Sequence, residues 1–442
     1  MSEIVLVGPD AELASDRVHF AGPETTLLSA AIALGNEIGA VSATVSLVPR
    51  GLTVGLLSAP GKKCDFYLMV DGWIAGISPE FTRFRGVGYL PFAPYAAACM
   101  AAAAVFISIR IKPDFLEAPS PHFYSLWSST NAADEQLLQD GPEAFPERFI
   151  DIELGGCGAV GLAFAATWWA IPGLRTHMTG VDGDPEGIDS TNLNRYFICG
   201  RSSVDKDKPS ELQRILQRDH FKVTPVSGYV GQTRAPNPRP TVGICALDNN
   251  VARQAFMKRY HRRMYRGSTS GLRAEVVVAG PPGEGQCLVC DLVPEVGVTQ
   301  EEEILRFKRA TPEEKRKWCQ TAGVTLEEAE AWVASTKCST VGDQLISAMK
   351  GASPSVREFS VSFVSALCGV LLAARVYQDL VAPADRENVI SYQFRRPNAS
   401  VNRRLSMPRN LSCTFCMPGS VEVGVWSARY RAPLPDESPH GT

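Results

Sequence analysis

The stretch Phe149-Ile-Asp-Ile-Glu-Leu-Gly-Gly-Cys-Gly-Ala-Val-Gly161 decides the fold, because an apolar strand runs into a glycine turn and then into a helix of small residues. Gly156, Gly158 and Gly161 have the spacing Gly-x-Gly-x-x-Gly. This spacing lets the backbone approach a phosphate and lets the helix pack closely on the strand. The stretch therefore predicts a nucleotide-binding βα unit whose helix N-terminus faces an anion.

Acidic residues follow two further apolar strands. Asp182 and Asp184 come after the first strand, and Asp248 comes after the second. Asp184 follows Gly161 by 23 residues, a separation at which an acid can accept hydrogen bonds from a ribose. Ligands of open α/β sheets bind at the carboxyl ends of strands, so we expect these acids to line a nucleotide site.

Cations follow Asp184, before the strand that ends at Asp248, in an order that favours ATP over a nicotinamide cofactor. Arg195 ends the run Asn192-Leu-Asn-Arg195, and Lys208 follows in Asp205-Lys-Asp-Lys208, where Lys206 is the alternative lysine. Chemistry on ATP needs cations on the phosphates and a carboxylate for magnesium, for which Asp248 is the candidate. Hydride transfer needs none of these groups. A NAD-dependent oxidoreductase is thus the weaker hypothesis from the fold alone.

Two cysteine pairs have metal-ligand spacing. Cys287-x-x-Cys290 and Cys413-x-x-Cys416 are separated by 122 residues, which is too far for one local zinc ribbon. Two loops of a folded domain can bring such pairs together, and four thiolates make a closed tetrahedral zinc site. We therefore predict a structural zinc site, with two unrelated reduced pairs as the alternative.

Length and composition describe an ordinary folded protein with two or three domains. The 442 residues include 45% hydrophobic and 21% charged residues, and the net charge is −3. This charge gives no bulk attraction to nucleic acid or to an anionic membrane, so neither is an expected partner. The N-terminus has no signal-peptide pattern, and the apolar run at 95–107 is too short to cross a bilayer. We expect a cytoplasmic protein.

The composition and the predicted secondary structure change along the chain. Residues 1–145 alternate short β-rich runs with alanine-rich helices, which predicts α/β structure with a mostly parallel sheet. A proline-marked polar stretch then precedes the glycine turn. Residues from Gln300 to about Lys350 are charged and helical, and Thr311-Pro-Glu-Glu predicts a helix start.

Taken together, these motifs resemble the ubiquitin-activating and ThiF/MoeB adenylyltransferase superfamily. The resemblance covers about residues 150–296 and 355–418 and is specific as an ensemble. It implies a Rossmann-like α/β adenylation fold in which the glycine loop, Asp184 and Asn192 bind ATP. It also implies that Arg195 and Lys208 hold the phosphates and that Asp248 serves magnesium.

The resemblance also implies a domain organisation like that of ubiquitin-activating enzymes. Residues 1–145 are similar to a degenerate, inactive adenylation-like half, with Arg17 as a candidate to reach the ATP. Residues 146–296 and 355–442 then form the active adenylation domain with its zinc site. Residues 297–354 form a small helical insert, placed where such enzymes carry their catalytic cysteine.

This insert offers two thiols. Cys338, in Lys337-Cys-Ser-Thr, follows a predicted helix in a polar turn, and the adjacent lysine lowers a thiol pKa. Its context also resembles the thioester cysteine of the family. Cys319 lies in a helical pattern beside Trp318 and is better explained by packing. We therefore expect Cys338 to be the nucleophile.

Two positions depart from the pattern of the family. It usually has a glycine where Asp205 stands and a glutamine where Tyr196 stands. Both positions lie next to the expected phosphate cations, so the geometry of the phosphate loop is the open point of the resemblance.

The expected activity is ATP-dependent adenylation of a ubiquitin-like protein, thioester formation on Cys338, and transfer to a conjugating-like enzyme. The compact size resembles bacterial versions from antiviral operons, and a second copy of the chain is a further candidate partner. The alternatives are a sulfur-carrier or peptide-modifying adenylyltransferase and a zinc-bearing scaffold with a dead nucleotide site.

Overall fold

The computed structural model describes residues 54–55, 64–80, 90–110, 121–142, 148–279, 286–290, 300–335, 345–346, 348–349, 361–382, 387–397, 399–400, 402–411, 413–417 and 419–430. The chain divides into two compact units. The first comprises Met1–Asp291 with Val361–Thr442, and the second comprises Leu292–Ser360.

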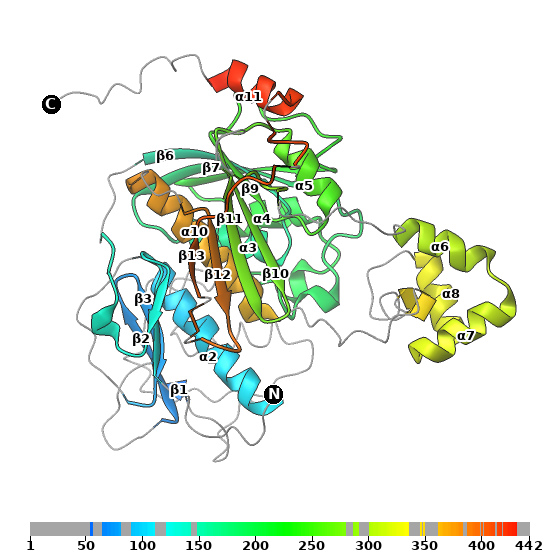
Figure 1. Cartoon of the computed structure of the whole chain (residues 1–442), viewed down its shortest axis with the longest axis horizontal. Helices are drawn as coiled ribbons and strands as arrows, with labels where there is room; N and C mark the ends of the chain where they lie inside the picture. The colour runs from blue at the N-terminus through cyan, green and yellow to red at the C-terminus, as the bar shows by residue number, and fades with distance from the viewer. Residues whose placement is uncertain are drawn as a thin grey trace. The chain divides into compact units, whose positions relative to one another are not determined.

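A mixed eight-stranded sheet forms the centre of the first unit (Figure 1). Its strands are β6 (Arg148–Gly155), β7 (Leu174–Asp182), β8 (Phe221–Ser227), β9 (Val242–Cys245), β10 (Arg263–Ser270), β11 (Arg273–Ala279), β12 (Val389–Gln393) and β13 (Arg403–Leu405). Their order across the sheet is β13-β12-β11-β10-β9-β6-β7-β8. Strands β6 to β10 pair in parallel, and β10 to β13 pair antiparallel.

The strand order reverses at β6. From β6 the chain moves outward to β7 and β8 and then returns to β9, which pairs with β6 on its other side. Connections therefore leave β6 and β9 in opposite directions, which makes the carboxyl ends of these strands a topological switch point. The expectation of a Rossmann-like α/β fold with a parallel sheet is confirmed.

Helices cover both faces of this sheet. They are α3 (Ala159–Trp169), α4 (Lys208–Leu216), α5 (Asn250–Met257), α10 (Ser362–Val381) and α11 (Val421–Tyr430), with the short 3-10 helices η2 (Ser190–Asn192) and η3 (Arg201–Ser203). α10 packs against α3, β10 and β11. A Cβ at Gly369 would lie 2.5 Å from the backbone nitrogen of Phe164, so the glycine allows α3 and α10 to approach closely.

Among the described residues, α10 is the one helix that is long and apolar enough to cross a membrane by length and composition. In the most apolar window of α10, 83% of the residues are buried within the protein. A helix that is apolar on all sides is expected in the core of a large domain, and we assign α10 to that core.

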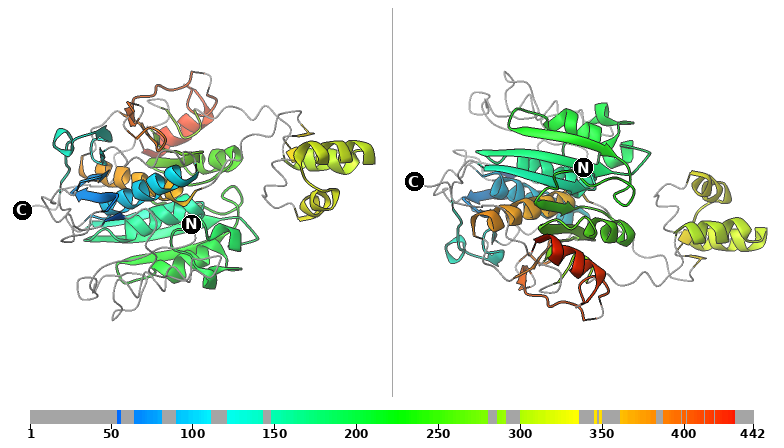
Figure 2. Two further views of the ribbon diagram at one scale, coloured as in Figure 1. Left: turned by 90° about the horizontal axis from the view of Figure 1, so that it is seen from below. Right: turned by 90° about the horizontal axis from the view of Figure 1, so that it is seen from above.

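A second, smaller sheet belongs to the same unit. It contains β1 (Val54–Gly55), β2 (Phe66–Asp71), β3 (Ile74–Ser78), β4 (His122–Ser125) and β5 (Thr130–Ala132), in that order, followed by η1 (Glu135–Leu137). Helix α2 (Phe92–Arg110) packs on β2 and β3 and lies alongside α10 (Figure 2). Strands β2 to β5 pair antiparallel, and only the short β1 is parallel to its neighbour. The expectation of a mostly parallel sheet in residues 1–145 is wrong for the described strands.

The second unit is helical where it is described. Its helices are α6 (Gln300–Arg309), α7 (Pro312–Ala322) and α8 (Leu326–Ser335). Thr311 and Glu314 form a reciprocal capping box at the start of α7, as the sequence predicts, and Gly323 ends α7 in the left-handed conformation. A small core that includes Phe307, Cys319 and Trp332 holds these helices together.

Candidate nucleotide site and four-cysteine cluster

The glycine turn lies at the switch point, where β6 ends. Gly156 has φ +92°, and a Cβ there would lie 2.5 Å from the carbonyl oxygen of Ala246. A Cβ at Gly161 would lie 2.0 Å from the carbonyl oxygen of Gly156. These two glycines are therefore required by backbone conformation and by close packing of the helix on the turn.

Gly158 is not required by close packing. It is the N-cap residue of α3 and supplies no side-chain cap, and the nearest atom to a Cβ there would be the Tyr196 hydroxyl at 3.7 Å. The first N–H groups of α3 thus have no cap from this residue, and the helix N-terminus carries partial positive charge. This arrangement suits the binding of a phosphate.

Asp182, at the end of β7, fixes the glycine turn. Its carboxylate accepts hydrogen bonds from the backbone nitrogen of Cys157 at 2.7 Å and from that of Asp184 at 3.0 Å. Burial raises the pKa of Asp182, and the nearby Lys208 partly offsets this effect. Asp182 therefore links the phosphate turn to the neighbouring acidic loop.

Asp184 and Lys208 meet beside the turn. The Lys208 ammonium lies 2.5 Å from the Asp184 carboxylate, and 10% of the Lys208 side chain is exposed against 39% of Asp184. Burial by itself lowers the pKa of Lys208, but the nearby Tyr196, Asp182 and Asp184 raise it above its ordinary value. Lys208 is thus a fully charged cation held among acceptor groups.

Lys208 rather than Lys206 occupies this position. Lys206 is exposed, whereas Lys208 begins α4, whose N-cap Asp207 accepts a hydrogen bond from the backbone nitrogen of Ser210 at 3.0 Å. Asp205 has φ +63°, the left-handed conformation that glycine adopts most readily. Asp205 therefore keeps the backbone shape that the usual glycine of the family would give.

Arg195 and Tyr196 stand next to Lys208. The Tyr196 ring centroid lies 5.7 Å from the guanidinium carbon of Arg195 and 5.8 Å from the Lys208 ammonium. The Arg195 guanidinium also donates to the carbonyl oxygen of Thr191 at 3.0 Å. Tyr196 is buried, and burial raises its pKa. A neutral phenol thus packs between the two cations.

The side chain of Asn192 is engaged in local structure. Its Oδ1 accepts a hydrogen bond from the backbone nitrogen of Asp189 at 3.0 Å, which completes a capping box around η2. In this arrangement Asn192 shapes the loop that carries Arg195.

Asp248 lies at the same edge of the sheet as the glycine turn. It follows β9, whose next residue, Ala246, donates a backbone hydrogen bond to the carbonyl oxygen of Gly155 at 2.8 Å. The Asp248 side chain is exposed and accepts a hydrogen bond from the Asn249 amide at 3.2 Å. An exposed carboxylate at this edge can hold a magnesium ion.

Two loops that are distant in the sequence bring four cysteines together. The sulfur atoms of Cys287, Cys290, Cys413 and Cys416 all lie within 4.8 Å of one another, and all four residues are buried. The sulfurs of Cys287 and Cys413 are 3.7 Å apart, and those of Cys290 and Cys416 are 3.1 Å apart. None of the four forms a disulfide.

This donor set fits zinc. A tetrahedral zinc ion about 2.3 Å from four thiolates places the sulfurs about 3.8 Å apart. Asn410 donates to the carbonyl oxygen of Cys290 at 3.1 Å, and the buried Arg266 on β10 donates to that of Leu288. The Arg266 bond anchors the first loop to the sheet, and the Asn410 bond joins the second loop to the first. The cluster can therefore tie the C-terminal segment to the centre of the fold.

The two remaining candidates cannot be placed. Cys338 and Arg17 lie outside the described residues. Cys319 is described: it is buried in the core of the second unit, and burial raises its pKa. It has the environment of a packing residue, as its sequence context indicates.

Sequence reasoning missed the roles of two residues. The sequence identifies Asp182 only as an acid at the end of a strand, and Tyr196 only as a departure from the pattern of the family. The sequence signal for the role of Asp182 is its position at the end of a strand, two residues before Asp184. A side chain at the end of a strand next to β6 is within reach of the backbone of the turn.

A model of the ThiF family matches residues 148–414, which is more than half of the chain. The chain belongs to the ThiF family. The matched region contains the glycine turn, the acids and cations beside it, and three of the four clustered cysteines. The resemblance to the ThiF/MoeB superfamily is thereby confirmed.

Individual relatives match less of the chain. The uncharacterized protein y4jF of Sinorhizobium fredii is 28% identical over 163 residues, which are 34% of this chain. The chain spans only 28% of the length of that curated relative.

Two solved structures of E. coli MccB are similar to this chain. MccB with MccA-N7isoASN is 12% identical, with a TM-score of 0.38, over 61% of this chain and 67% of that one. MccB alone is 15% identical, with a TM-score of 0.39, over 62% and 66%.

Proposed function

We propose that this ThiF-family chain is an ATP-dependent adenylyltransferase that activates the C-terminal carboxylate of a ubiquitin-like protein. The observation that carries the proposal is the Lys208–Asp184 pair, 2.5 Å apart, beside an uncapped glycine turn at the switch point. A dinucleotide-dependent dehydrogenase needs the turn and the acid but has no use for a buried lysine among the phosphates.

Each group has a role that follows from its position. The N–H groups at the start of α3 would bind phosphate oxygens, and Asp184 would accept hydrogen bonds from the ribose. Lys208 would then exchange its ion pair with Asp184 for the phosphates, together with Arg195. Asp248 would hold magnesium, which neutralises charge on the phosphates.

The proposed reaction needs only ATP and the carboxylate of the substrate as reactants. A carboxylate oxygen of the C-terminal glycine of the substrate attacks the α-phosphorus of ATP. The bond from that phosphorus to the bridging oxygen breaks, and pyrophosphate leaves. The positive groups beside the turn stabilise the charge that develops on the phosphates.

We propose a second step on Cys338. Its thiolate attacks the acyl carbon of the adenylate, AMP leaves, and the thioester keeps the acyl group activated for a cysteine of a conjugating-like enzyme. A bacterial antiviral pathway is the context that we propose for this chemistry. The second candidate is a sulfur-carrier or peptide-modifying adenylyltransferase, and it needs no acyl thioester on Cys338.

One experiment separates these proposals. The chain is incubated with ATP, magnesium and a purified ubiquitin-like protein that ends in glycine, and pyrophosphate release and intact mass are recorded. We expect pyrophosphate release together with an adduct that thiols remove. Cys338→Ala should lose the adduct but still form the adenylate, whereas Cys319→Ala should behave as the parent.

Two outcomes would count against parts of the proposal. Pyrophosphate release without any adduct would favour the adenylyltransferase that needs no thioester. An Asp248→Ala variant that forms adenylate at the parental rate would contradict the role of Asp248 in holding magnesium.

A further inference from the structure

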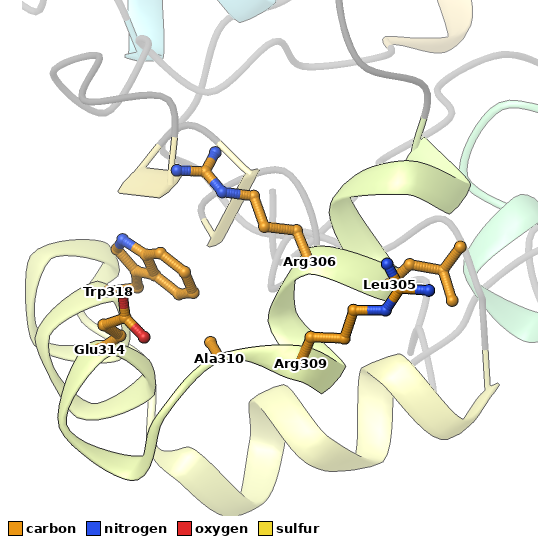
Figure 3. A pocket seen from close by; sticks show the side chains of 6 residues that line it. All are labelled: Leu305, Arg306, Arg309, Ala310, Glu314 and Trp318. Atoms are coloured by element: carbon orange, nitrogen blue, oxygen red, sulfur yellow. The ribbon is translucent and has the colours of Figure 1, made fainter.

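The second unit contains a hollow of about 440 Å³ between α6 and α7 (Figure 3). It is lined by Leu305, Arg306, Arg309, Ala310, Glu314 and Trp318. These residues are not part of the proposed nucleotide site, and the expected chemistry gives them no role.

One side of the hollow combines a cation with an aromatic ring. Arg306 extends over Trp318, with its guanidinium carbon 5.3 Å from the ring centroid (Figure 3). The Arg306 side chain also donates to the carbonyl oxygen of Met349 at 3.3 Å. Trp318 packs on the buried Phe307, with 6.3 Å between the ring centroids. The indole and the guanidinium are therefore held in place before any partner binds.

The opposite side is basic and apolar. Arg309, one helical turn after Arg306, extends toward Leu305, and both side chains are exposed (Figure 3). Leu305 exposes 46% of its surface, although it is a large apolar residue. Ala310 lies between the two sides and leaves the centre open.

Glu314 limits which anion fits. Its carboxylate accepts hydrogen bonds from the backbone nitrogen and the hydroxyl of Thr311 at 2.9 and 2.8 Å, so it is fixed at the wall. This negative charge disfavours a multiply charged phosphate. Two arginines, one fixed carboxylate and apolar surface instead suit separate carboxylates, each singly charged, on either side of an aliphatic side chain.

We propose that this hollow is a docking site for an acidic segment of a partner protein, in which a leucine-like side chain is flanked by carboxylates. The carboxylates pair with Arg306 and Arg309, and the aliphatic side chain packs on Trp318 and Leu305. Charge complementarity and the exposed apolar surface together select this occupant.

The test measures peptide binding to the full-length chain without ATP, so its result does not depend on the proposed adenylation. The probe is acetyl-Gly-Glu-Leu-Glu-Gly carrying a neutral dye, followed by fluorescence anisotropy. We expect saturable binding that weakens with salt and weakens about tenfold when both glutamates are replaced by glutamine.

Matched variants locate the site. Arg306→Gln with Arg309→Gln should weaken binding of the acidic peptide about tenfold. Arg316→Gln removes an exposed arginine of α7 that does not line the hollow, and it should bind as the parent does. Trp318→Leu should also weaken binding, with circular dichroism to establish that the helices persist.

Three results would overturn the proposal. The first is equal binding of the acidic and glutamine peptides by the parent chain. The second is unchanged binding by the double arginine variant. The third is capture of anionic lipid vesicles through these arginines without peptide binding, which would assign the hollow to a membrane surface.

Discussion

Lys208 is the residue on which the nucleotide site depends most. It is buried beside Asp184 and Tyr196, whereas Lys206, two positions earlier, is exposed. Lys208→Ala should therefore weaken ATP binding about 10- to 100-fold, as expected when a hydrogen bond to a charged group is lost. Isothermal titration calorimetry measures this, with Lys206→Ala as the control. Equal losses in both variants would contradict the assignment.

Glu211 gives a prediction with a pH dependence. It is buried and accepts hydrogen bonds from Ser203 at 2.5 Å and from Arg214 at 2.7 Å. Burial by itself raises its pKa, but the bonds from Arg214 and Ser203 lower it below its ordinary value of 4.5. The ionised form therefore stabilises the fold above about pH 4.5, and this contribution is lost as the pH falls through the lower folded-state pKa.

Glu211→Gln should accordingly lower the free energy of unfolding by about 2 kcal/mol at neutral pH. The difference from the parent should shrink below pH 4.5, the ordinary pKa of this residue. Urea denaturation at several pH values measures both effects. Asp219→Asn, at an exposed acid, serves as the control. A difference that stays constant through this range would contradict the predicted pKa shift.

For individual residues of the nucleotide site, the sequence predicts the backbone conformation better than the side-chain contacts. Gly156 and Gly161 are required by local geometry, so their spacing alone revealed the turn. The bond from Cys157 to Asp182 and the packing of Tyr196 on Lys208 join residues that are distant or irregularly spaced. Such contacts depend on how β6, β7 and α4 meet, and no periodicity encodes that.

Two aspartates in the loop before α4 have opposite effects on the free energy of unfolding. Asp205 adopts φ +63°, and Asp207 caps the helix. Asp205→Gly should raise the free energy of unfolding by about 0.5 kcal/mol because glycine adopts this conformation without strain. Asp207→Ala should lower it by about 1 kcal/mol because the cap is lost. Thermal melting compares the two, and an Asp205→Gly variant less stable than the parent would contradict the first expectation.

The two cysteine loops meet at the four clustered sulfur atoms. We expect the purified protein to contain a single zinc ion per chain and to lose thermal stability when a chelator removes it. Cys416→Ser should reduce the bound zinc, whereas Cys319→Ser, in the other core, should retain it. Elemental analysis decides the question. Full zinc content in Cys416→Ser would show that the four sulfurs are not the ligand set.

The strands of the smaller sheet show why their direction differs from the prediction. All five residues of β3 and the first four of β2 are buried, so both strands read as continuous apolar runs rather than as an alternation. Such runs are typical of parallel strands covered on both faces. Here α2 and the aromatic residues around Trp73 bury antiparallel strands in the same way. A continuous apolar run indicates that a strand is buried, and burial does not reveal the direction of the strand.

In the molecule as a whole, the ThiF-family match at 148–414 includes the helical unit, which has a core of its own. The order of motifs allowed the family and the meeting of the distant cysteine pairs to be predicted. The domain boundaries and the role of residues 1–145 as an inactive adenylation-like half stay predictions. The hollow of the helical unit had no sequence signal because exposed arginines are common on solvated helices.

We expect the switch-point site to bind ATP rather than a nicotinamide dinucleotide. Isothermal titration calorimetry of the purified chain with ATP and magnesium, and separately with NADH, tests this without any partner protein. We predict saturable binding of ATP, weakened about 10- to 100-fold in Lys208→Ala, and no binding of NADH. Binding of NADH with no response to ATP would contradict the assignment of Lys208 and Arg195 to the phosphates of ATP.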